Sequence, residues 1–188
     1  MASRLLGSAG ITRCADEIAM TTPPSAFGLY PSCKALHIAA DALRSARFRQ
    51  TEISILYSDG SQAYRLRESA ADRAVADDDG ASLGGMLSSL SGVGAFGTAE
   101  EGPFLVGGPL LALVNGGCAL RPSLECLGIS EGAVDRFEGR LKNGDLLLSV
   151  QCDDPEWTTR ALSILKATGA YEVEVSAAAV PAPLPLAV

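Results

Sequence analysis

Residues 80–129 constrain the fold of this chain most strongly, because small and aliphatic residues alternate there at helical spacing. Small residues that recur at every fourth position let two helices approach backbone to backbone. We therefore predict that two runs of such residues within 80–129 form a close-packed helical hairpin. Pro109 and Pro122 each suit a first helical position and separately predict helices over 109–119 and 122–128. The recurring small residues are Gly80, Gly84, Ser88 and Gly92 in the first run, and Gly108, Ala112 and Gly116 in the second.

Aliphatic side chains adjoin both runs of small residues and would leave a large apolar face in water on a monomer. Soluble monomers rarely expose such a patch, so a second copy of the chain is predicted to cover it and form a homo-oligomer. Leucine in place of Gly84, Gly92 or Gly108 is then expected to weaken assembly while the rest of the chain stays folded. The predicted self-association residues are Gly84, Leu87, Gly92, Gly108, Leu111, Ala112 and Gly116.

Contact with a membrane is the second interpretation of this segment, and the length of its helices argues against a span. Residues 104–120, if wholly helical, would reach roughly 25 Å, which is short of the roughly 30 Å of a bilayer's hydrocarbon core. Gly107-Gly108-Pro109 would interrupt that helix, and Asn115 would lie near its middle. Protein is therefore the predicted partner of these helices.

The composition excludes several classes of function. The chain has 188 residues, enough for one domain with an insertion, and a net charge of −7 with a pI near 4.7. Nucleic acid and anionic lipid are not predicted as partners, because both require clustered Lys and Arg. The five cysteines form no C-x-x-C pair, only one histidine accompanies them, and no phosphate-binding glycine motif occurs. We therefore predict no metal, no cofactor and no disulfide framework, and a cytoplasmic protein without a signal peptide.

A strand–helix–strand unit precedes the glycine-rich segment. An apolar and aromatic run over 26–30 predicts a strand that ends at Pro31-Ser32. Ser32 is a good N-cap for an amphipathic helix over 33–46, and residues 52–57 alternate as a second strand. The same order of elements follows the glycine-rich segment.

The second unit begins with the apolar run 145–152, which is typical of a central strand that is covered on at least one face. Asp154 is predicted to cap a helix over 155–168, and residues 171–176 alternate as a final strand. A separate amphipathic helix, capped by Ser130, precedes this unit.

The two units match in role when they are overlaid at a shift of 122 residues, which pairs Asp154 with Ser32 and Leu165 with Leu43. Two βαβ halves predict an α+β, ferredoxin-like fold, in which a four-stranded antiparallel sheet carries both helices on one face. The glycine-rich helices are then an insertion between the halves. The predicted organisation is a flexible tail over 1–25, a first half over 26–58, the insertion over 59–144, a second half over 145–176 and a flexible tail over 177–188.

Glycine, proline and packing positions within residues 26–176 also carry a resemblance. They are Gly102-Pro103, Gly108-Pro109-Leu110, Leu127-Gly128-Ile129-Ser130-Glu131, Phe137-Glu138, and Gly144 with Leu146 to Val150. In these positions the chain resembles a bacterial family of general stress proteins, of the heat-induced and low-temperature-induced types. The resemblance implies a glycine-rich middle between two βαβ segments, and it carries over no activity and no catalytic residue. The chain departs from the family by its long tails and by Asn115, Arg121 and Glu125, which interrupt a segment that is more uniformly apolar in the family.

Cysteines at two helix starts are the best candidates for a reactive group, although no partner base is predicted beside either. Cys33 lies at the start of the first helix, where the helix dipole lowers a thiol pKa, and Cys152 lies at a comparable junction. His37 follows Cys33 by one turn but belongs to the solvent face, so ordinary packing is the favoured role of both cysteines. Packing is likewise favoured over a ligand pocket for Tyr30, Trp157 and Tyr171.

Three functional hypotheses remain, and none of them is an enzyme. The first is a non-catalytic, stress-associated protein that self-associates through the small-residue helices of 80–129. The second is a membrane-associated protein that uses the same helices. The third is a regulatory module that binds a small ligand on the ferredoxin-like sheet.

Overall fold

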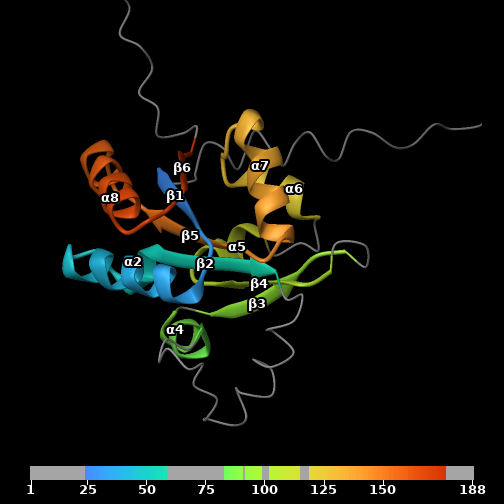
Figure 1. Cartoon of the computed structure of the whole chain (residues 1–188), viewed down its shortest axis with the longest axis horizontal. Helices are drawn as coiled ribbons and strands as arrows, with labels where there is room; N and C mark the ends of the chain where they lie inside the picture. Colours follow the sequence, from blue (N-terminus) through green and yellow to red (C-terminus); the bar gives the residue numbers. More distant parts are fainter. Residues whose placement is uncertain (1–23, 59–82, 91, 99–101, 115–118, 177–188) are drawn as a thin grey trace, which may run out of the picture.

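The computed structural model describes residues 24–58, 83–90, 92–98, 102–114 and 119–176. Within them the chain forms an α+β fold, in which one antiparallel sheet lies between two layers of helices (Figure 1). The predicted tails over 1–25 and 177–188 lie outside the described residues, apart from residues 24 and 25. Residues 59–82, at the start of the predicted insertion, lie outside them too.

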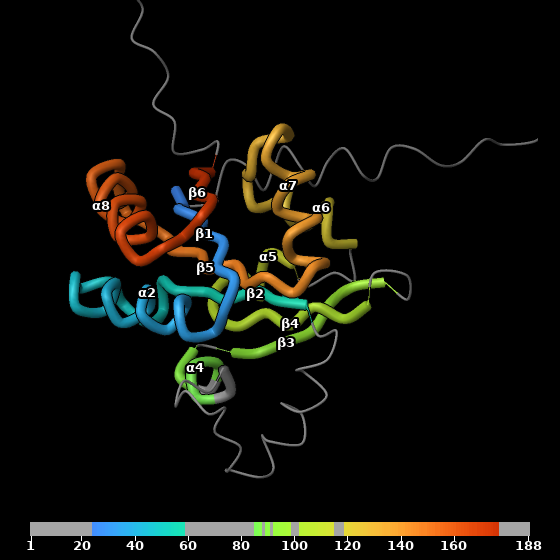
Figure 2. The backbone as a smooth tube through the Cα atoms, viewed as in Figure 1, coloured from blue at the N-terminus to red at the C-terminus, as the bar shows by residue number. Residues whose placement is uncertain are grey.

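Six strands form the sheet, in the order β3-β4-β2-β5-β1-β6, and every neighbouring pair is antiparallel. The tube in Figure 2 shows how β5, late in the sequence, runs between β1 and β2, which are early. The strands are β1 (Ser25–Tyr30), β2 (Ile53–Ser58), β3 (Val93–Phe96), β4 (Phe104–Gly107), β5 (Leu146–Gln151) and β6 (Glu172–Val175).

The four predicted strands are present and adjacent, as β2-β5-β1-β6. Strands of the two halves alternate in this order, since β5 pairs with both β2 and β1, and β1 also pairs with β6. In the β2–β5 pair, Tyr57 lies opposite Leu146 and Ile53 opposite Val150. Because the sheet contains six strands and not four, the predicted four-stranded sheet is wrong in its extent. The two additional strands, β3 and β4, come from the segment that was predicted to be helical.

Local sequence explains where the two long helices that flank the sheet begin. The hydroxyl of Ser32 accepts from the backbone N–H of Ala35, and the carboxylate of Asp154 accepts from that of Trp157, 2.9 Å away. Both predicted caps are therefore confirmed. The helices are α2 (Cys33–Ser45), α4 (Leu83–Ser89), α5 (Leu110–Val114), α6 (Leu120–Cys126), α7 (Glu131–Lys142) and α8 (Pro155–Ala167), with the 3₁₀ turn η1 (Gln50–Glu52) before β2.

Helices cover both faces of the sheet (Figure 1). Alternation along the central strand β5 supplies both faces, since Leu146 and Leu148 contact the α2 side while Leu147 contacts the α7 side. This double burial accounts for the unbroken apolar run of β5. The α2 side contains α2, α8 and α4, as predicted for the two long helices, and the α7 side contains α5, α6 and α7.

Two details of the predicted helices are wrong. Ser130 flanks α7, but its hydroxyl bonds the Glu174 carboxylate 3.1 Å away and makes no cap bond. The helix predicted to begin at Pro122 begins at Leu120, with Pro122 as its third residue. Proline is tolerated there because the first N–H groups of a helix have no intrahelical partner.

Candidate functional site

The predicted helical hairpin of residues 80–129 is not formed, because the chain between α4 and α5 runs as the β3–β4 hairpin at one end of the sheet. Leu87 of α4 is buried on the α2 side, whereas Leu111 of α5 packs on the α7 side. The two small-faced segments therefore lie on opposite faces of the sheet and cannot contact each other as predicted. Of the predicted self-association residues, Gly84 and Leu87 lie in α4, Gly92 precedes β3, Gly108 follows β4, Leu111 and Ala112 lie in α5, and Gly116 is outside the described residues.

The small residues serve turns and close contacts between sheet and helix. Gly92 and Gly108 have φ of 85° and 91°, a left-handed conformation that suits glycine. A Cβ added at Gly107 would lie 2.7 Å from Leu87 of α4, and one at Gly94 would collide with Leu111 of α5. The absence of a side chain at Gly94 in β3 and at Gly107 in β4 therefore lets α5 and α4 pack closely on opposite faces.

Gly108 has the strictest requirement of these residues. A Cβ at Gly108 would collide with the carbonyl oxygen of Ile53 in β2. The Gly108 N–H donates to Gly92 O at 3.0 Å, and two residues later the Leu110 N–H donates to the buried hydroxyl of Ser54, also at 3.0 Å. Gly108 thus fixes the turn that leads β4 into α5.

Strand β3 ends the sheet and exposes apolar side chains on one face. Val93 is 51% exposed and Ala95 is exposed, both on the α2 side, where their opposite residues in β4 are Gly107 and Leu105. On the other face Phe96 is buried and stacks on Phe104 of β4, with ring centroids 5.7 Å apart. We call the outer side of Val93–Phe96 the β3 edge. It is the first candidate site, because it lies in the segment predicted to self-associate.

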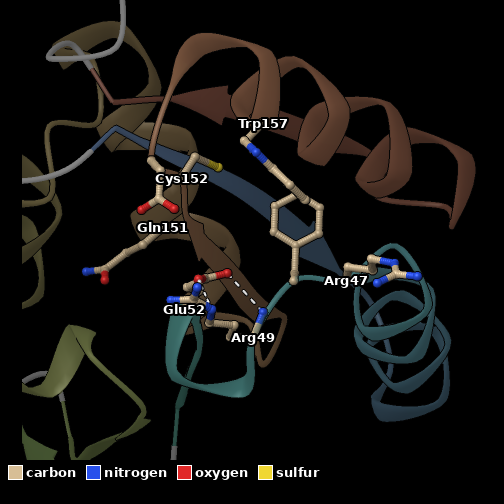
Figure 3. Close-up of a pocket in the computed structure, with 8 residues that line it drawn as sticks. Arg47, Arg49, Glu52, Gln151, Cys152 and Trp157 are labelled. Carbon is tan, nitrogen blue, oxygen red and sulfur yellow. Dashed lines mark hydrogen bonds and ion pairs between the residues drawn. The ribbon is translucent and has the colours of Figure 1, made fainter.

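A small cavity beside the start of α8 is the second candidate (Figure 3). Its volume is about 100 Å³, and it lies between the loop after α2 and the junction of β5 with α8. Its lining combines aromatic, thiol and charged groups. The lining residues are Arg47, Phe48, Arg49, Glu52, Gln151, Cys152, Asp153 and Trp157.

The Cys152 thiol in this cavity is not activated as a nucleophile. Cys152 is buried, and its Sγ donates to the carbonyl of Val150, 3.6 Å away. Burial raises the pKa of the Cys152 thiol to about 11, so it is protonated at neutral pH and a poor nucleophile. Cys33, the other predicted candidate, is the first residue of α2 and is half-buried. His37 lies one turn later, with Nε2 3.4 Å from Asp41 Oδ2.

Aromatic side chains divide between the cavity and the core. Trp157 lines the cavity and meets Phe48 edge to face, with ring centroids 4.9 Å apart. The predicted packing role therefore accounts for only part of its environment. Tyr30 is fully buried, and its hydroxyl donates to the carbonyl of Leu165, 3.2 Å away. Tyr171 lies away from the cavity, where its hydroxyl bonds Asp145; burial, with that carboxylate, raises the pKa of Tyr171.

The rim of the cavity carries charges of both signs. The backbone N–H of Arg49 donates to Glu52 Oε2 at 2.9 Å, and the side-chain Nε of Arg49 lies 3.6 Å from the other oxygen of that carboxylate. The Arg49 side chain is 78% exposed. The exposed carboxylate of Asp153 has no hydrogen bond or ion pair with another described residue. In Figure 3 the Arg47 side chain points away from Glu52 and Cys152.

Arg47 has a backbone conformation that sequence reasoning missed. Within the described residues, four helices end with a backbone N–H that donates to the carbonyl five residues earlier, and in each a residue of the closing turn is left-handed. Glycine occupies that position in α6, α7 and α8, whereas α2 has Arg47, at φ 75°. No pattern in the sequence signals this, because glycine is the residue that marks such an ending. The left-handed residues are Arg47, Gly128, Gly144 and Gly169, and the bonds run to Leu43, Leu124, Arg140 and Leu165.

In comparisons with known proteins, no family model, no curated protein and no solved structure matches the chain. Within the described part of the chain, no helix is both long and apolar enough to cross a membrane.

Proposed function

We propose that this chain is a non-catalytic protein that self-associates through the β3 edge. The observation that carries the proposal is the exposure of Val93 and Ala95 on a terminal strand that contains no charged residue. An uncharged terminal strand with exposed apolar side chains favours contact with another protein chain. The proposed contact surface lies in the segment 80–129 that was predicted to self-associate, but it is strand β3 and not the helices of that segment.

Two further parts of the proposal concern fold and family. We propose that β2, β5, β1 and β6, with α2 and α8 on one face, form a duplicated βαβ unit of the ferredoxin-like type. The antiparallel pairing of β2 with β5 and of β1 with β5 supports this. A stress-associated role rests on the sequence resemblance to the general stress proteins alone, and a cytoplasmic location rests on cysteines whose number and spacing predict no disulfide framework.

The mass of the purified full-length chain in solution tests self-association directly. Light scattering without detergent, over a range of protein concentrations, should give a mass above that of one chain and rising with concentration. A single monomer mass throughout the range would refute the proposal. A chain that stays in solution only with detergent, or that partitions into vesicles, would instead support the membrane-associated alternative.

The cavity beside α8 favours a second function, binding of a small zwitterion such as a free α-amino acid. Arg49 offers a guanidinium for a carboxylate, and Asp153 offers a carboxylate for an ammonium group. Phe48 and Trp157 form an aromatic wall for an apolar side chain. A volume of about 100 Å³ restricts the ligand to a small one.

Thermal unfolding with a panel of free amino acids tests this second function. A ligand should raise the melting temperature of the parent protein, and Asp153→Asn should remove that rise. Glu156→Gln is the matched control, because Glu156 is an exposed acid in the first turn of α8 outside the cavity lining. An equal rise with the corresponding amine or carboxylic acid alone would contradict recognition of a zwitterion.

A further inference from the structure

The β3 edge lacks the features that usually prevent a strand from pairing with another chain. Among the described strands, β3 pairs with β4 alone. Natural sheets protect their edges with charged residues or proline, and Val93–Phe96 contains neither. The absence of charge extends over the whole stretch 80–99. The main-chain groups of this edge are therefore suited to hydrogen bonding with a further strand.

The opposite edge of the same sheet is built differently. In β6, Glu172 and Glu174 alternate with valines, and both acids are held by groups at α7. Arg136 forms an ion pair with Glu172, and the Ser130 hydroxyl bonds Glu174 at 3.1 Å. Charge thus protects one edge of the sheet and is absent from the other.

We infer that β3 pairs antiparallel with β3 of a second copy of this chain, about a twofold axis that passes through Gly94. The pairing joins two six-stranded sheets into one continuous sheet. This inference rests on the proposed self-association through the β3 edge and adds the pairing of the two strands, their symmetry and their register.

Side-chain direction selects the position of the axis. Val93 and Ala95 face the α2 side of the sheet, and Gly94 faces the α7 side, where Leu111 covers it. A twofold axis perpendicular to the sheet keeps each face continuous, so residues opposite each other must face the same side. An axis at Gly94 places Val93 opposite Ala95 of the partner subunit. Both exposed apolar side chains of each copy are then covered.

A second copy fits this edge better than an unrelated acidic or basic partner. The pairing places no charged residue of the strand opposite another, although each chain carries a net charge of −7. Because the strand has only four residues, the contact is small and the dimer is expected to be weak and concentration-dependent.

The test begins with single charged substitutions in the full chain. Val93→Lys and Ala95→Glu each bring two like charges close together across the axis, so each should raise the dimer dissociation constant about tenfold or more in analytical ultracentrifugation. Ile38→Lys is the matched control, because Ile38 is equally exposed, at 53%, but lies on α2. It should leave the dissociation constant unchanged. Circular dichroism on each variant verifies that the fold is kept.

A double substitution tests the register itself. Val93→Lys combined with Ala95→Glu places opposite charges against each other in both cross-strand pairs, so it should restore the dimer that each single change weakens. Failure of this rescue would overturn the axis at Gly94. Dimers of parent strength in both single variants would overturn the β3 contact while leaving self-association intact, whereas a monomeric parent protein would refute both proposals.

Discussion

The backbone N–H of Phe48 donates to the carbonyl of Leu43, 3.1 Å away, and this bond closes the end of α2 around Arg47. Arg47 therefore adopts a φ of 75°, which costs an L-residue with a side chain roughly 1 kcal/mol relative to glycine. Arg47→Gly should raise the free energy of unfolding by roughly 0.5–1 kcal/mol in urea denaturation. A fall in stability would mean that the arginine side chain contributes more to the fold than its backbone conformation costs.

The reverse substitution at the end of α7 provides the matched control. Gly144 has a φ of 96° in the same type of helix ending, and a Cβ added there meets nothing within 4 Å. Gly144→Arg should therefore lower the free energy of unfolding by roughly 1 kcal/mol through backbone strain alone. Similar changes of opposite sign at the two positions would support a common conformational cause.

Local sequence patterns predicted the parts of the fold whose signals have a single structural meaning. Ser32 and Asp154 are caps because their side chains can accept from the free N–H groups of a helix start, and no other local role fits them as well. The apolar run of β5 has a similarly restricted meaning, because a strand buried on both faces needs no polar alternation.

The glycine-rich segment was mispredicted because its small residues meet several different needs at similar spacing. Gly92 and Gly108 permit left-handed turns, whereas Gly94 and Gly107 make room for leucines from helices on opposite faces. A helix with a small residue at every fourth position would have a similar sequence pattern. Strand β4 is stabilised by pairing with β2, which is distant in sequence, and β3 pairs only with β4, so no local pattern could reveal these strands.

The candidate sites were only partly accessible to sequence reasoning. Sequence patterns singled out Cys152 before α8 and Trp157 in its first turn, but their neighbours Phe48 and Arg49 come from the other half of the chain. The β3 edge was hidden because a strand becomes terminal only when the order of the whole sheet is known.

The buried thiol of Cys152 predicts a pH dependence of stability. Burial raises its pKa from 9.0 to about 11, so the unfolded chain loses this proton at lower pH than the folded chain does. The stabilisation is complete below about pH 9 and is lost as pH rises to about 11. Urea unfolding across this range should show the fall. Cys152→Ala should reduce it, whereas Cys33→Ala, which removes a half-buried thiol, should retain it.

Gly108 offers the sharpest test of the turn between β4 and α5. Gly108→Ala would require a left-handed φ of 91° and would drive its Cβ into the Ile53 carbonyl, so the free energy of unfolding should fall by more than about 2 kcal/mol. Gly102→Ala is the matched control, because Gly102 has a φ of 78° but open space around the added Cβ. The free energy of unfolding of Gly102→Ala should fall by only roughly 1 kcal/mol.

A leucine substitution at Gly108 separates an effect on folding from an effect on assembly. The sequence alone suggested that leucine at this position would weaken self-association and leave the fold intact, whereas the contact with Ile53 implies that the fold itself would be damaged. Thermal unfolding of Gly108→Leu at low protein concentration, where association is minimal, should therefore show a lower melting temperature than that of the parent. An unchanged melting temperature would contradict the tight turn and would return Gly108 to the set of assembly residues.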